Sequence, residues 1–228
     1  MLFRHSFLDV LQGRSIRSAK AFTLVELLIL TAILSLLACV LIPCLARQKH
    51  HARVQACFDN LKQVGVAFRT WAVDQSDLPS TGVSVTSGGT LELAASGQAF
   101  IHLRAMSNEL SSPGILICPC DQMKTVASNF NCGFSDSNVS YFVSPDARDV
   151  FPQMLQTGDR NLAFEDKPLE PGVFVWTSNM STLSWTKAIH NRCGNVGLAD
   201  GSIHFCDSKK LGAALWDQDC ATNRLAIP

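Results

Sequence analysis

An apolar run near the N-terminus constrains this chain more than any other feature. The run covers residues 22–42, reads FTLVELLILTAILSLLACVLI and holds one charged side chain, that of Glu26. A helix of this length rises about 30 Å, which is the thickness of the hydrocarbon core of a bilayer. We therefore expect a transmembrane helix over residues 22–42.

The segment that precedes the run, residues 1–21, is basic. Its charged side chains are Arg4, Arg14, Arg17 and Lys20, with the single acid Asp9. A secretory signal peptide has an apolar stretch of about 7–15 residues followed by a small-residue cleavage site. The longer run found here fits a membrane helix with a basic leader better than it fits such a signal.

The overall composition argues against nucleic acid as a partner. The chain has 19 basic and 19 acidic residues and a formal net charge of zero, whereas phosphate binding needs a basic surface. Only 17% of residues are charged and 47% are hydrophobic. This balance favours a folded chain over a disordered one.

The residues around the start of the apolar run carry a family resemblance. Residues 20–26 read Lys20-Ala21-Phe22-Thr23-Leu24-Val25-Glu26. They resemble the processing site of type IV pilins and type II secretion pseudopilins. The resemblance implies that a membrane peptidase cuts the Ala21–Phe22 bond and methylates the new amino group of Phe22. The family usually has Gly before the cut, where this chain has Ala21.

Two further residues gain a role from the same resemblance. Glu26 would pair with the N-terminal amine of a neighbouring subunit in a filament, so that a buried charge has a partner. A charge inside an apolar helix is by default a functional candidate; the alternative is a snorkelling or protonated acid at the membrane surface. Pro43 stands where many type IV pilins have a helix-distorting proline, so we expect a kink or a melted turn there.

Residues 43–77 are expected to continue the helix as an amphipathic one. Apolar residues recur at intervals of three and four, which is typical of one buried helix face. They are Cys57, Leu61, Val64, Phe68 and Trp71. We interpret this stripe as core packing that docks the helix onto a head formed by residues 78–228.

The head is predicted to be α+β, so that the whole chain would be pilin-like, with a long N-terminal helix packed on a small antiparallel sheet. A helix is expected over residues 99–110 and a last one ending near Trp216, capped by Asp207 or Ser208. Short apolar runs predict strands over residues 115–118, 139–143, 162–164 and 172–176. Strands over residues 196–199 and 202–206 flank Asp200-Gly201, which suits a type I′ hairpin turn.

The hairpin carries a second resemblance. The segment from His190 to Gly201 resembles the H-X9-DG pattern of prepilin-like proteins of planctomycete and verrucomicrobial bacteria. In it, His190 is followed by nine residues and then by Asp200-Gly201. Two other segments are similar to segments of those proteins, Leu116-Ile117-Cys118-Pro119 followed by Asp121, and Gly158-Asp159-Arg160-Asn161.

The role of His190 has two interpretations. It is a metal-binding or catalytic residue near Asp200, or it is a structural imidazole that hydrogen-bonds the hairpin backbone, with Asp200 and Gly201 present because the turn favours them. We favour the structural role. Ser202 and His204 share a face of one strand, but no recognisable nucleophile motif surrounds them, so we expect no catalytic residue.

The nine cysteines fall into two groups. Cys39 and Cys44 lie in or beside the membrane helix, where a thiol is a small apolar group. Seven lie beyond it, and an exported head would permit disulfides and leave at least one thiol over. Cys118-Pro119-Cys120 has one residue between its thiols, where zinc motifs have two to four. We therefore expect no metal and no cofactor.

These observations predict a structural, non-enzymatic subunit that is pilin-like or pseudopilin-like. Its expected partners are the prepilin peptidase and methyltransferase, other pilin or pseudopilin subunits, the inner-membrane assembly platform of a type IV pilus or type II secretion system, and membrane lipid. We expect a single pass through the cytoplasmic membrane, with the head in the periplasm or in a surface filament. The alternatives are a membrane-anchored periplasmic binding protein that does not polymerise and an anchored hydrolase centred on His190.

Overall fold

A computed structural model describes residues 22–75, 78–218 and 220–228. The expected leader, residues 1–21 with the cleavage residue Ala21, lies outside the described residues. The chain divides into two compact units, residues 1–48 and 49–228. Helix α1 (Leu24–Asp74) contributes its first part to one unit and its remainder to the other.

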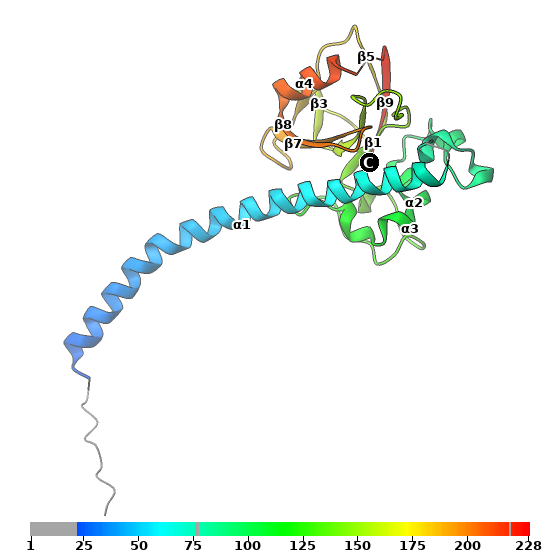
Figure 1. Cartoon of the computed structure of the whole chain (residues 1–228). Helices are drawn as coiled ribbons and strands as arrows, with labels where there is room; N and C mark the ends of the chain where they lie inside the picture. The colour runs from blue at the N-terminus through cyan, green and yellow to red at the C-terminus, as the bar shows by residue number, and fades with distance from the viewer. Residues whose placement is uncertain (1–21, 76–77, 219) are drawn as a thin grey trace, which may run out of the picture. The chain divides into compact units, whose positions relative to one another are not determined.

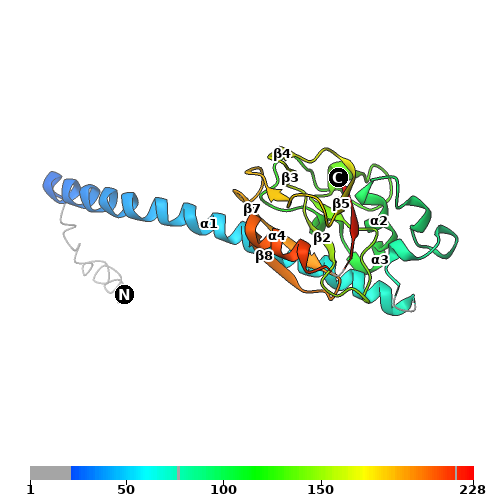
Figure 2. The ribbon, with the colours of Figure 1, turned by 90° about the horizontal axis from the view of Figure 1, so that it is seen from above.

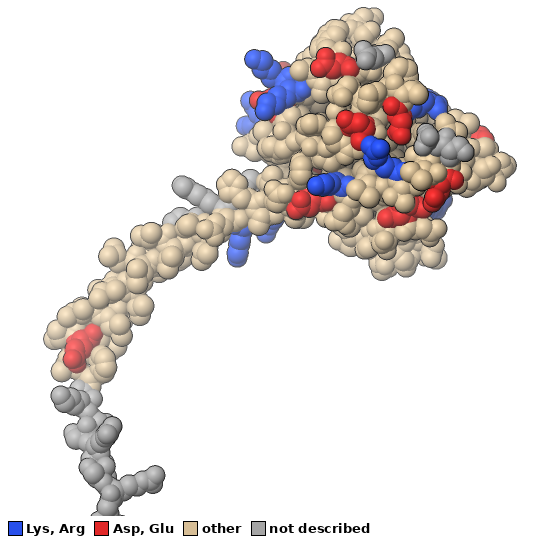
Figure 3. Space-filling view, in the orientation of Figure 1, with Lys and Arg blue, Asp and Glu red and all other residues tan. Residues whose placement is uncertain are grey.

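The first unit is the apolar part of α1. Leu24–Ile42 has a mean hydropathy of 2.8 and none of it is buried against the rest of the described chain. In the space-filling view this helix surface is uncharged apart from one acidic side chain near its start (Figure 3). The expectation of one helix long and apolar enough to span a membrane is confirmed. The helix continues through residue 43, and the kink expected at Pro43 stays a prediction.

The second unit begins with the amphipathic part of α1. All five residues of the predicted apolar stripe are buried: Cys57, Leu61, Val64, Phe68 and Trp71. The charged residues between them, such as Lys62 and Arg69, are exposed. The predicted role of the stripe in core packing is therefore confirmed.

A six-stranded antiparallel sheet forms the centre of this unit, in the order β5-β9-β1-β2-β7-β8. Its strands are β1 (Tyr141–Val143), β2 (Leu155–Asp159), β5 (Gly172–Thr177), β7 (Cys193–Leu198), β8 (Ile203–Asp207) and β9 (Thr222–Ile227). Figures 1 and 2 show β7 and β8 at one side of the unit and β5 at the other. A second, three-stranded sheet has the order β4-β3-β6, with β3 (Leu162–Phe164), β4 (Lys167–Pro168) and β6 (Ser184–Trp185).

Short helices complete the unit. The α-helices are α2 (Ala99–Ala105), α3 (Ser107–Leu110) and α4 (Ser208–Trp216). Five short 3-10 helices are η1 (Ser80–Gly82), η2 (Val85–Ser87), η3 (Leu91–Leu93), η4 (Pro113–Leu116) and η5 (Asp136–Asn138). The side chain of Asp207 accepts a hydrogen bond from the backbone N–H of Lys210 at 2.9 Å and caps α4, as the sequence predicted.

The larger sheet separates two apolar cores. Along β1, Tyr141 and Val143 contribute to the core that contains the stripe of α1 and helix α2, whereas Phe142 contributes to the opposite one. That second core includes residues of α4 and of the smaller sheet, such as Leu211 and Leu162. The alternation follows from the two-residue repeat of a strand. The predicted α+β class with a mostly antiparallel sheet is confirmed.

Some local predictions were wrong. The apolar run at residues 115–118 is not a strand: its first half belongs to η4, because Pro113 starts a tight turn capped by the side chain of Ser112. The expected helix over residues 99–110 breaks at Met106 into α2 and α3.

The hairpin turn also differs from the prediction. Gly201 has a φ of +84°, but Asp200 is not in the left-handed region that a type I′ turn requires. Gly201 N–H bonds Leu198 C=O, and Leu198 N–H bonds Ser202 C=O, each at 2.9 Å. This pattern is a three-residue loop that ends in a left-handed glycine.

Candidate functional site

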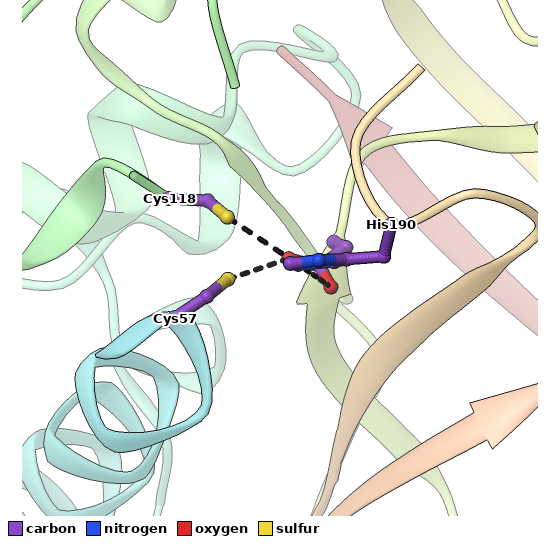
Figure 4. Close-up of side chains that lie close together, drawn as sticks. Cys57, Cys118 and His190 are labelled. Atoms are coloured by element: carbon purple, nitrogen blue, oxygen red, sulfur yellow. Dashed lines mark hydrogen bonds and ion pairs between the residues drawn. The ribbon is translucent and has the colours of Figure 1, made fainter. Parts of the chain in front are cut away.

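Four buried side chains from separate chain segments meet between α1 and the larger sheet. Cys57 comes from α1, Cys118 follows η4, Asp159 ends β2 and His190 precedes β7. One ligand atom from each lies within 4.8 Å of the others. Figure 4 shows Cys57, Cys118 and His190 pointing toward a common point. We call these four residues the buried cluster.

Short contacts connect the buried cluster. Cys118 Sγ lies 3.4 Å from His190 Nε2, and the same nitrogen lies 3.3 Å from Asp159 Oδ2. Cys57 Sγ donates to Asp159 Oδ1 at 3.3 Å. Tyr141 Oη lies 3.5 Å from Cys57 Sγ, so the edge of the cluster is also polar.

Asn195 on the neighbouring strand β7 fixes the orientation of Asp159. Its backbone N–H and its side-chain amide donate to Asp159 Oδ2 at 2.6 and 3.0 Å. The same amide lies 3.5 Å from Cys57 Sγ. Both Asn195 donors therefore use one carboxylate oxygen and leave the other to face Cys57.

Gly158 allows the strands to approach closely at this point. A Cβ atom here would lie 2.7 Å from the ring of Phe142 and 2.7 Å from the carbonyl oxygen of Asn195. Any larger residue at position 158 would push β2 away from β1 or β7. Asp159, the next residue of β2, would move with it.

An ion pair joins two residues that are near cluster members in the sequence: Arg160 follows Asp159, and Asp121 lies shortly after Cys118. Arg160 donates through Nε and Nη2 to the two oxygens of Asp121, at 2.7 and 2.9 Å. The Asp121 side chain is 1% exposed. This pair joins the loop after Cys118 to the end of β2, so two segments of the second family resemblance meet here.

Burial and mutual contacts perturb the ionisation of the cluster. The side-chain interaction with Cys57, against the opposing effect of burial, lowers the pKa of the Cys118 thiol to about 5, with His190 acting in the same direction. The same pairing with Cys118, together with burial, raises the pKa of Cys57. Burial raises the pKa of the Asp159 carboxyl to about 7. For His190, burial opposes the charged form, but Cys118 and Asp159 outweigh it and raise its pKa.

The buried cluster is closed to solvent. The side chains of His190 and Asp159 are both 0% exposed, and Cys57 and Cys118 are likewise 0% exposed. Such a site can hold a hydrogen-bonded network or a small ion. Within the part of the chain that the structure describes, these four side chains have no solvent-exposed surface.

The other residues of the H-X9-DG pattern lie in the hairpin. The carboxylate of Asp200 accepts from the N–H of Ser202 at 2.8 Å, and the carbonyl of Asp200 accepts from the guanidinium of Arg69 on α1. A Cβ on Gly201 would lie 2.7 Å from Arg69 Cδ. Asp200 and Gly201 thus shape the turn and seat it on α1. The contacts that the structure gives for His190 Nε2 are instead to Cys118 and Asp159.

Ser202 and His204 do lie side by side on the exposed face of the hairpin. Ser202 Oγ and His204 Nε2 are 3.0 Å apart. Nucleophilic catalysis also requires a third group that orients the histidine. Within the described ranges, no hydrogen bond to the other ring nitrogen of His204 is present.

The start of α1 contains the other predicted site residues. The Glu26 carboxylate accepts from the backbone N–H and the hydroxyl of Thr23, both at 2.9 Å, and the Thr23 hydroxyl accepts from Glu26 N–H at 3.2 Å. This reciprocal arrangement is a capping box. Phe22 immediately precedes it and is 73% exposed.

Comparisons with known proteins give no family for this chain. Scans of protein-family models, curated proteins and solved structures found no match. A functional assignment therefore has to come from the residues and their geometry.

The sequence analysis missed the buried cluster because its members are far apart in the chain. Cys57 and Asp159 are separated by 102 positions, and Cys118 and His190 by 72. Cys57 was interpreted as part of the core stripe and as one of seven head cysteines that an exported head would permit to form disulfides. One signal in the sequence could have indicated the cluster: Cys118, Asp159 and His190 each lie in one of the three head segments that carry the second family resemblance.

Proposed function

We propose that the chain is a pilin-like or pseudopilin-like subunit that assembles through the first part of α1 into a type IV pilus or type II secretion filament. The observation that carries the proposal is the apolar stretch Leu24–Ile42, which is wholly exposed. In water such a surface is unfavourable. It needs lipid before assembly and the helices of other subunits afterwards.

The position of Glu26 supports the same function. Its carboxylate is held at the first turn of α1 by Thr23, four residues from Phe22. If the Ala21–Phe22 bond is cut, the new amine arises at the same end of the helix. A carboxylate within an apolar membrane helix is unfavourable, and pairing with the amine of a neighbouring subunit offsets that cost.

The head fits a structural role in this proposal. The histidine of the H-X9-DG pattern is fully buried, and Asp200 and Gly201 connect the hairpin to α1. These residues hold the fold together. We therefore propose a mechanical, non-enzymatic subunit in the cytoplasmic membrane, with its head on the periplasmic side.

Substitution of Glu26 separates its local role from its intersubunit role. Glu26→Gln keeps a side chain that can complete the capping box but removes the charge. Thr23→Ala is the matched control, because it removes the capping partner and keeps the charge. Each chain is produced together with a prepilin peptidase and an assembly platform, and filaments sheared from the cells are quantified by immunoblot and electron microscopy.

The proposal predicts that Glu26→Gln lowers the yield of filaments at least about tenfold, whereas Thr23→Ala assembles nearly as well as the wild type. Resistance to alkaline extraction from membranes should be the same for all three chains. A wild-type chain that stays in the membrane and never polymerises would favour the anchored binding protein instead. Equal loss of filaments in both variants would assign Glu26 to helix capping alone.

A further inference from the structure

We propose that the buried cluster is a structural zinc site in which one Zn²⁺ ion is held by four side chains, those of Cys57, Cys118, Asp159 and His190. The inference concerns the head alone. It stands or falls independently of filament assembly.

The ligand chemistry selects this ion. Thiolate sulfur, imidazole nitrogen and carboxylate oxygen are the three ligand types that Zn²⁺ takes in proteins. Calcium and magnesium prefer sites made of oxygen ligands only, and the cluster supplies two sulfurs and one nitrogen among its four ligand atoms. A four-ligand set rich in sulfur and nitrogen is typical of tetrahedral zinc.

The spacing of the atoms fits a tetrahedron around one ion. With bonds of about 2.3 Å to sulfur and about 2.0–2.1 Å to nitrogen or oxygen, neighbouring ligands of tetrahedral zinc lie about 3.3–3.8 Å apart. Cys118 Sγ to His190 Nε2 is 3.4 Å, and Cys57 Sγ to Asp159 Oδ1 is 3.3 Å. His190 Nε2 to Asp159 Oδ2 is 3.3 Å, and every pair of ligand atoms in the cluster lies within 4.8 Å.

The surroundings of Asp159 match those of a metal-bound carboxylate. Metal-bound carboxylates are themselves oriented by hydrogen bonds from neighbouring residues. Asn195 supplies two such bonds to Asp159 Oδ2, which also lies 3.3 Å from His190 Nε2, and Asp159 Oδ1 accepts from Cys57.

The site would act as a cross-link inside the head. Structural zinc sites have four protein ligands and no open position, and all four side chains here are inaccessible to solvent. The ion would connect α1 to the loop after η4, to β2 and to the loop before β7. Binding requires both sulfurs as thiolates and His190 Nε2 without its proton, and its free energy adds to that of folding.

The main competing chemistry is a disulfide between Cys57 and Cys118. Both thiols belong to the same cluster, and an exported head would meet an oxidising environment. A disulfide consumes both thiolates and leaves only Asp159 and His190, so the two states exclude each other. An experiment that measures metal content and thiol state together therefore decides between them.

The first measurement is the metal content of the full chain. The protein is extracted in detergent without chelators and without a polyhistidine tag, and zinc is quantified by mass spectrometry of the elements. The proposal predicts about one Zn²⁺ per chain. Cys118→Ser should lower that value at least about fivefold, because it removes one of four ligands.

Two other thiols serve as matched controls. Cys120→Ser changes the half-buried thiol two residues along, and Cys206→Ser changes a buried thiol outside the cluster. Both variants should keep the zinc content of the wild type. Loss of zinc in Cys120→Ser with retention in Cys118→Ser would overturn the assigned ligand set.

A spectroscopic measurement on the wild type avoids any dependence on variants that fail to fold. Replacement of zinc by Co²⁺ should give the strong visible absorption of a tetrahedral site and a thiolate-to-cobalt charge-transfer band. Absence of both bands after reconstitution of the reduced chain would overturn the proposal. So would a Cys57–Cys118 disulfide found by peptide mapping of the protein as isolated, or a six-coordinate cobalt spectrum.

Discussion

At the scale of single residues, Gly158 sets the position of Asp159. The carbonyl oxygen of Asn195 and the ring of Phe142 both lie 2.7 Å from where a Cβ atom of residue 158 would be. A glycine therefore lets β2 lie close enough to β7 for Asn195 to bond the carboxylate. The buried cluster depends on a residue that carries no chemistry of its own.

We expect Gly158→Ala to lower the free energy of unfolding by about 2 kcal/mol, because it overpacks a closed site. The matched control is Gly65→Ala in α1, where a new Cβ would meet Ile203 and Gly201 at ordinary distances of 3.5 and 3.6 Å. That change should be neutral or stabilise by up to about 1 kcal/mol, since alanine favours helix. Denaturant unfolding of the full chain in detergent, followed by tryptophan fluorescence, measures both. Equal effects would contradict this account of Gly158.

The ion pair of Asp121 and Arg160 predicts a dependence of stability on pH. Burial alone would raise the pKa of the Asp121 carboxyl, but the hydrogen bonds and charge of Arg160 outweigh it and lower the pKa in the folded state. The pair therefore contributes its full stabilisation of the folded state at pH values above about 3.9, the pKa of an aspartate in the unfolded chain. The contribution is lost as the pH falls through the lower, folded pKa.

The measurement compares the wild type with Asp121→Asn. At about pH 6 the wild type should be more stable by about 3 kcal/mol, because the variant leaves the Arg160 charge without its partner. The difference should shrink as the pH falls below about 4. A difference in unfolding midpoint that stays constant down to about pH 2 would contradict the role assigned to this pair.

Some of the special residues could be identified from the sequence, and others could not. It identified Glu26 and His190 as special because each stands in a recognisable local pattern. It assigned no chemistry to Asp159, because the partners of that carboxylate come from α1, from β7 and from the loop before β7. Contacts between segments so distant in the chain produce no regular spacing in the sequence from which they could be predicted.

At the scale of elements, α1 has two parts with different environments. Its first part is apolar and exposed along Leu24–Ile42. Its second part buries one face, and Leu61 at the centre of that face is 0% exposed while Val66 is 58% exposed. The same helix thus has an exposed apolar part and a part that is packed on the rest of its unit.

This asymmetry gives a direct test on the second part of α1. Leu61→Ala should lower the free energy of unfolding by about 2–5 kcal/mol, because it leaves a cavity in the core. Val66→Ala, on the exposed face, should change it by less than about 0.5 kcal/mol. Thermal or denaturant unfolding monitored by fluorescence compares the two. Similar losses would mean that α1 is not packed on the head as described.

Elements marked by local pattern were predicted well, and others were not. β3 and β8 follow apolar runs, and α4 follows its Asp207 cap, whereas β7 begins at Cys193, three residues before the predicted strand. β2 reads Leu-Gln-Thr-Gly-Asp and is buried throughout, yet it lacks an apolar pattern. Several of its polar groups form hydrogen bonds with neighbouring strands and with residues such as Gln218 and Asn195, which only the tertiary fold reveals.

At the scale of the whole molecule, the chain combines a membrane-compatible helix with an α+β unit. The division falls between residues 48 and 49, inside α1. The two proposals concern different units: assembly belongs to the apolar first part, and zinc belongs to the second unit. A failure of one leaves the other intact.

The central claim is that residues 1–21 are removed and the chain enters a filament through its new N-terminus. Mass spectrometry of the intact protein, extracted from membranes of cells that contain a prepilin peptidase, tests this most directly. We predict a chain that begins at Phe22 and carries one added methyl group on its amine. A chain that begins at Met1, or at a residue beyond the apolar run, would contradict the account.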